Sequence, residues 1–190
     1  MKTNTTLLLL TLILGACSTG ISTPQTLPAG PPTHTSLPPT FTPAPDYSST
    51  QCGYQWAYED LPELTAQFDQ AVKGLIPNST SHATAFGENC VAADGQVVRF
   101  LAMETDFYVI VSVETLDDYE TFGNWVSQVM QVVSELPTDA VAGPKPGFVE
   151  FRFEKSTSES IGFRVPIQGF AETAGGKSGE ALFRLFYNAP

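Results

Sequence analysis

DFYVIVSVE, residues 106–114, is the stretch from which the fold class follows. Its apolar residues recur at every second position, a period typical of a β-strand. At the centre the intervening positions are apolar as well, because Tyr108 and Ile110 occupy them. A strand that is apolar on both faces belongs in the interior of a sheet. We therefore expect other strands to pair with it on both sides.

Four further segments read as strands. Residues 82–92 and 97–103 flank the turn signal Ala93-Asp94-Gly95. Near the C-terminus, residues 149–154 and 161–168 alternate apolar side chains with polar or charged ones, so the sheet should be solvated on one side. Pro166 indicates an edge strand, because proline cannot donate to a neighbouring strand.

Two segments carry apolar residues at three- and four-residue spacing and predict amphipathic helices, residues 61–75 and 118–136. Asp60 and Asp117 each precede a glutamate by three positions, which resembles a capping box. Residues 180–187 predict a short C-terminal helix. The pattern indicates an α+β fold in which two amphipathic helices, and the short third one, pack on one face of a largely antiparallel sheet of about five strands.

The N-terminus has the features of an export signal. Lys2 provides a positive charge, and residues 7–14 form an apolar run interrupted only by Thr11. The run is too short to span a bilayer as a helix, which needs about 20 residues. It is followed directly by Leu14-Gly15-Ala16-Cys17.

These last four residues resemble the lipobox of bacterial lipoproteins, which reads Leu, a small residue, Gly or Ala, and then Cys. The resemblance implies that the Cys17 thiol is joined to diacylglycerol, that residues 1–16 are removed as a signal peptide, and that the new amino terminus is acylated. Several acyl chains give stable anchoring, since each buried CH₂ contributes about 0.8 kcal/mol and one chain binds only marginally. We expect an extracytoplasmic protein anchored to a bacterial membrane; a plain secretory peptide or a free cysteine is the alternative.

The remainder divides into a linker and a domain. Residues 17–50 hold eight of the fifteen prolines among many Ser and Thr residues, with Asp46 as the only charged side chain, which predicts a disordered stalk with polyproline bias. Residues 51–190 have the composition and length of one globular domain. This domain carries the whole net charge of −11, which argues against nucleic acid or anionic lipid as partners.

The cysteine count predicts one disulfide. With Cys17 assigned to lipid, Cys52 and Cys90 remain as a pair in an oxidising compartment. A metal site at these cysteines would need further His or Cys ligands nearby, and the sequence has none there.

No cofactor or nucleophile motif is present, and we expect neither a cofactor nor a metal. His82, the only histidine of the domain, is read as a surface residue of a Ser-rich loop. The best acidic pair is Glu104 and Asp106, which in an extended chain project from one face about 7 Å apart. That spacing suits paired carboxylates or a cation; the alternative is a charged strand connection.

The aromatic residues Tyr54, Trp56 and Tyr58 share one face of an extended chain. They form a flat platform that binds sugar rings or a partner chain; the alternative is that they pack over the first helix beside the Cys52 bridge. We predict a non-enzymatic binding or interaction module, displayed on a flexible stalk, whose partner is an envelope protein or glycan. The alternative function is a carboxylate-based hydrolase of cell-envelope glycans that uses Glu104 and Asp106.

Overall fold

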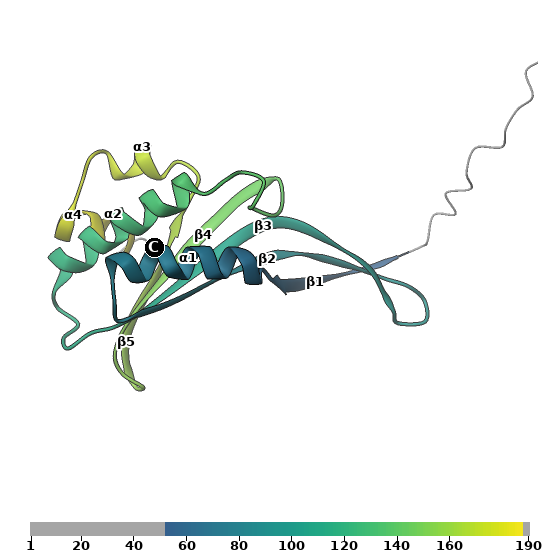
Figure 1. The fold of residues 1–190 in the computed structure, drawn as a ribbon, viewed down its shortest axis with the longest axis horizontal. Coiled ribbons are helices and arrows are strands. Elements are labelled where there is room, and N and C mark those ends of the chain that lie inside the picture. The colour runs from purple at the N-terminus through teal and green to yellow at the C-terminus, as the bar shows by residue number, and fades with distance from the viewer. Residues whose placement is uncertain (1–51, 188–190) are drawn as a thin grey trace, which may run out of the picture. The chain divides into compact units, whose positions relative to one another are not determined.

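The structure, a computed structural model, describes residues 52–187 (Figure 1). The predicted signal peptide (1–16), the lipidation site Cys17 and the stalk (17–50) lie outside the described residues. Within the described range, none of the helices has the length and apolar character needed to cross a bilayer.

Five strands form one sheet in the order β1-β2-β3-β4-β5. Their bounds are Gly53–Asp60, Ser79–Val91, Val97–Ser112, Lys145–Ser156 and Glu159–Pro166. Neighbouring strands are antiparallel except β3 and β4, which are parallel. A parallel pair needs a crossover connection, and the helix α2 (Tyr119–Glu135) provides it. The predicted α+β class with a largely antiparallel sheet is confirmed, and β3, which contains the 106–112 run, is the central strand.

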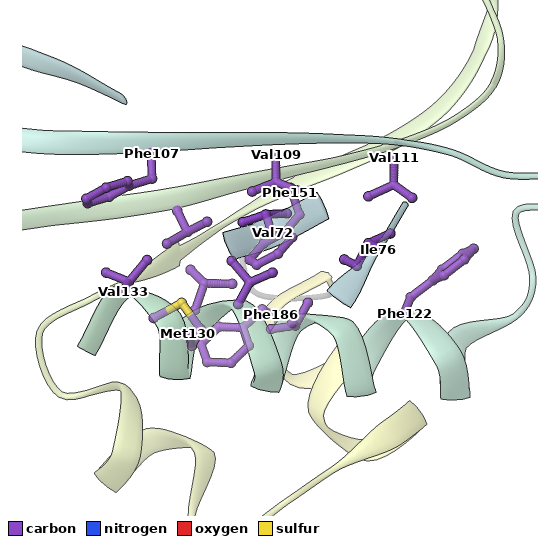
Figure 2. Close-up of a cluster of buried hydrophobic side chains, with 14 of the residues drawn as sticks. Val72, Ile76, Phe107, Val109, Val111, Phe122, Met130, Val133, Phe151 and Phe186 are labelled. Carbon is purple, nitrogen blue, oxygen red and sulfur yellow. The ribbon is translucent and has the colours of Figure 1, made fainter. Parts of the chain in front are cut away.

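The helices α1 (Pro62–Leu75), α2 and α4 (Gly179–Tyr187) pack on the sheet, and a short helix α3 (Phe170–Ala174) precedes α4. Their apolar stripes meet the inward side chains of β3, β4 and β5 in one core (Figure 2). Aromatic rings dominate its centre. The ring centroids of Phe122 in α2 and Phe153 in β4 are 4.2 Å apart, and those of Phe68 in α1 and Phe107 in β3 are 4.8 Å apart. The largest fully buried side chains come from every layer: Phe68, Phe107, Phe122, Phe151, Phe153 and Phe183.

Two strand boundaries differ from the prediction. The segments 97–103 and 106–114 are one continuous strand, β3, because a register shift at Phe86/Gly87 absorbs Met103 as an extra residue and lets the pairing with β2 continue. Residues 53–60, which are not among the predicted strands, form the edge strand β1. The predicted number of strands was right, but the chain is divided among the strands differently.

Both predicted helix caps are also wrong in detail. Leu61, not Asp60, is the N-cap of α1 and makes no side-chain capping bond, while Asp118, next to the predicted Asp117, caps α2 by accepting a hydrogen bond from the Thr121 N–H at 3.1 Å. The Cys52–Cys90 disulfide is confirmed and joins the residue before β1 to the end of β2.

Candidate binding surface

Within residues 52–187, the helices all pack on one face of the sheet, and we call the opposite face the open face. Side chains alternate along each strand, so the inward direction of Phe107 and Val109 sends Asp106 and Tyr108 to the opposite side. Cross-strand register extends this assignment to His82, Thr84 and Phe86 of β2, to Tyr54, Trp56 and Tyr58 of β1, to Phe148 and Glu150 of β4, and to Arg164 of β5. Aromatic rings gather there in two clusters.

The first cluster lies on β1 and β2. Trp56 stacks on Phe86 with ring centroids 5.3 Å apart, and Tyr58 approaches the same ring at 5.1 Å. Tyr54 lies on the same side of β1, beside the disulfide. The three β1 rings are 55%, 65% and 65% exposed in chain order, so they are largely presented to solvent instead of packing over α1. Exposed aromatic surface of this kind is typical of binding sites.

The second cluster lies at the centre of the open face. His82 stacks on Tyr108 at 4.6 Å with nearly parallel ring planes, and Tyr108 meets Phe148 edge-on at 5.9 Å. The guanidinium of Arg164 covers the Phe148 ring at 4.1 Å and donates to Glu150 at 2.8 Å. The cluster therefore combines flat apolar rings with a hydrogen-bond donor, Arg164, and an acceptor, Glu150, at its border.

Asp106 separates the two clusters and fills an irregularity in the sheet. The β3–β4 register shifts here, so that Asp106 stands opposite Gly147 and Phe148. Its carboxylate accepts a hydrogen bond from the Phe148 N–H at 3.3 Å. Only glycine fits at position 147, because a Cβ there would lie 2.1 Å from Asp106 Oδ1. The carboxylate thus replaces a missing ladder partner.

The electrostatics of this region follow from burial. Asp106 is 1% exposed, and burial raises the pKa of its carboxyl to about 6; the neighbouring Glu104 carboxylate adds to the rise, while the Phe148 N–H opposes it. Burial and then the Asp106 charge also raise the pKa of the Tyr108 hydroxyl. The buried Thr84 Oγ1 has no hydrogen-bond partner of normal geometry among residues 52–187. It lies close enough to the Tyr108 hydroxyl to lower the pKa of that group in part.

The candidate acidic pair shares one face of β3. Glu104 is half-buried opposite Phe86, and Asp106 lies one pleat further along the same face. Neither is an ion-pair partner of Arg152 or Arg164, which bind Glu154 and Glu150. The burial of Asp106 and its bond to the backbone give it a structural task in the sheet.

Six members of the open face were not identified from the sequence as candidate site residues: Thr84, Phe86, Tyr108, Phe148, Glu150 and Arg164. The prediction for His82 was right about its exposure but wrong about its element, since it lies within β2 and not in a loop. The signal was present in part, because His82, Thr84 and Phe86 alternate with Ser81, Ala83 and Ala85. What the sequence could not show is that these residues and Tyr108 meet across neighbouring strands.

Other parts of the described surface offer fewer groups that could bind a ligand. A cavity of about 290 Å³ lies on the helix side near the end of α2 and is lined largely by apolar atoms around Phe107, Val133 and Pro146. Among residues 52–187, no group of three or more His, Cys, Asp or Glu side chains is arranged to hold a metal ion.

Comparison of the chain with protein-family models, curated proteins and solved structures found no match.

Proposed function

We propose that this protein is a non-enzymatic, lipid-anchored binding module of the bacterial cell envelope that holds the sugar rings of a glycan on its open face. The observation that carries the proposal is the arrangement of aromatic rings from β1, β2, β3 and β4 on the side of the sheet that the helices leave free. The lipobox-like segment supports the location, and the disulfide fits an oxidising compartment.

Sugar rings suit this surface for two physical reasons. Their C–H faces pack on aromatic rings, and Trp56 and Tyr58 offer such faces with little further ordering cost, because Phe86 already supports them. Hydroxyl groups need donors and acceptors at the border, which Arg164 and Glu150 supply.

The charge of the chain narrows the ligand further. A net charge of −11 repels polyanions, so the expected glycan is neutral or carries amino groups. Binding should therefore survive moderate salt, since it depends on stacking and hydrogen bonds and not on long-range attraction.

The decisive experiment is a screen of the full chain carrying Cys17→Ser against immobilised envelope oligosaccharides, both neutral and polyanionic. We expect saturable binding to neutral glycans. Trp56→Ala or Tyr58→Ala should weaken it about 30-fold, which corresponds to roughly 2 kcal/mol for an aromatic contact residue. Tyr187→Ala, which alters an exposed tyrosine on α4, is the matched control and should bind normally.

Tryptophan fluorescence gives a second measurement. A Trp125→Phe chain leaves Trp56 as the only tryptophan, so a ligand that stacks on it should change its emission. Absence of binding across the screen, or equal binding by Trp56→Ala and the parent chain, would reject the proposal.

The hydrolase alternative rests on Glu104 and Asp106. The raised pKa of Asp106 is what a general acid requires, but a carboxyl that is 1% exposed and bonded to the backbone cannot reach a glycosidic oxygen without rearrangement. Release of reducing sugar by the parent chain, abolished by Glu104→Gln and Asp106→Asn, would favour the enzyme.

A further inference from the structure

β1 is an edge strand that lacks the usual protection. Within the part of the chain that the structure describes, β2 is its only strand partner, and seven of the eight β1 residues are exposed. Residues 53–58 contain no charge and no proline, and the β1–β2 register has no bulge. The strand at the opposite edge, β5, contains Arg164 and Pro166, and a charged residue and a proline are common means of preventing an edge strand from pairing with another chain.

The hydrogen-bonding groups of β1 are oriented for a new partner. The Leu61 N–H donates to the Ala83 carbonyl at 3.2 Å, which continues the β1–β2 ladder by one residue. Antiparallel bonds to a given neighbour recur at every second residue, so the N–H and C=O groups of Tyr54, Trp56 and Tyr58 point away from β2. These groups are available at the free edge.

The aromatic residues of β1 are also placed symmetrically about Trp56. Tyr54-Gln55-Trp56-Ala57-Tyr58 places aromatic residues at equal distances on either side of Trp56. An antiparallel pair of two such strands, centred on Trp56, sets Tyr54 of one copy opposite Tyr58 of the other at both ends. Every aromatic residue then has an aromatic cross-strand neighbour on the open face, a favourable kind of pair.

Charge placement permits the same register. Glu59 would stand opposite Gly53 of the second copy, and Asp60 opposite Cys52, so no two acids face one another. The helices do not obstruct the approach, because both faces of β1 are exposed and β1 lies beyond the helical layer together with the β2–β3 hairpin (Figure 1).

We infer that β1 is a self-association strand through which two copies of this chain form a two-fold symmetric dimer with one continuous ten-stranded sheet. The contact comprises up to six ladder hydrogen bonds and three aromatic pairs. It is smaller than a permanent interface, and we expect a dissociation constant on the order of 10–100 µM. The inference is independent of the glycan proposal, although the dimer would join the two open faces into one surface.

Sedimentation velocity of the full chain with Cys17→Ser, from about 1 to 300 µM, measures the association. We expect the mass to rise toward that of a dimer. Trp56→Lys places two like charges at the symmetry axis and should weaken association at least tenfold. Tyr54→Pro removes an outward N–H without removing a β1–β2 bond and should also weaken it. Tyr187→Lys should behave like the parent chain.

Cysteine cross-linking tests the register itself. Trp56→Cys should cross-link to its own copy, since opposed residues in this register lie about 5.5 Å apart at Cα, within disulfide range. Tyr54→Cys and Tyr58→Cys should each fail alone, because identical positions lie about 14 Å apart along the paired strands, yet they should cross-link when mixed. A chain that stays monomeric at 300 µM, or a dimer indifferent to Trp56→Lys and Tyr54→Pro, would overturn the inference.

Discussion

Replacing Asp106 by asparagine should stabilise the protein at neutral pH. The carboxyl is buried, and burial raises its pKa from 3.8 to about 6. Asparagine keeps the shape and the acceptor for the Phe148 N–H but carries no charge to desolvate. The variant therefore isolates the free energy that ionisation of one buried carboxyl costs the native state.

The magnitude follows from the pKa. A tenfold change in proton affinity is worth 1.36 kcal/mol, so a change from 3.8 to about 6 corresponds to about 3 kcal/mol. The native state holds this proton more tightly than the unfolded state does. The contribution of Asp106 to stability is thus fully present below pH 3.8 and is lost as the pH rises through about 6.

Urea unfolding of the parent chain and of Asp106→Asn at pH 4, 5, 6, 7 and 8 measures the difference. We expect near-equal stability at pH 4 and an advantage of about 1–3 kcal/mol for the variant at pH 7–8, the lower figure allowing for the buried amide. Asp139→Asn, at an exposed position, controls for the loss of one negative charge.

Only the difference between the two chains is diagnostic, because other groups act in the opposite direction. Burial raises the pKa of Asp69, but hydrogen bonds from Lys73 and Ser81 outweigh it and hold the pKa below its usual value, so its contribution is lost on acidification. If Asp106→Asn proved less stable than the parent at pH 7, the carboxylate would be a net stabiliser and the reasoning would be wrong.

Three further predictions concern packing, the disulfide and the anchor. Gly123→Ala should destabilise the chain by at least about 2 kcal/mol in thermal or urea unfolding, because its Cβ would lie 1.8 Å from the Gly179 carbonyl oxygen. Gly74→Ala is the control: a Cβ at position 74 meets no atom, so this variant should be as stable as the parent chain or more stable. Equal effects of the two substitutions would contradict this account. Cys90→Ser should cost roughly 4 kcal/mol through the released loop, measured by urea unfolding without reductant, and no loss would count against the loop argument. Cys17→Ser should move the protein from the membrane fraction to the soluble fraction on cell fractionation, and persistence in the membrane would remove the support for lipidation.

The elements themselves were largely readable from local sequence. The two-residue period around Val109 and the three- and four-residue spacing around Val126 predict a strand and a helix, because the side that faces the core must be apolar along the whole element. Capping was less predictable: Asp117 and Asp118 are adjacent acids, and the backbone conformation at the helix entrance decides which one reaches an N–H group.

The candidate site was only partly predictable. Tyr54, Trp56 and Tyr58 alternate within one strand, so their common face is a local property of the chain. The pairing of His82 with Tyr108 depends on the β2–β3 register, and that of Tyr108 with Phe148 on the parallel β3–β4 pair. No pattern within a single segment contains that information.

The sequence by itself therefore determined the types of most elements, the disulfide pair and the expectation of a lipid anchor, since each rests on short-range spacing or on residue counts. Tertiary structure alone decided which strands flank the 106–112 run, and that one of these neighbours is antiparallel and the other parallel. The physical reason is that burial of one continuous apolar layer selects the strand order, and the strand order then brings distant aromatic residues together on the face left open.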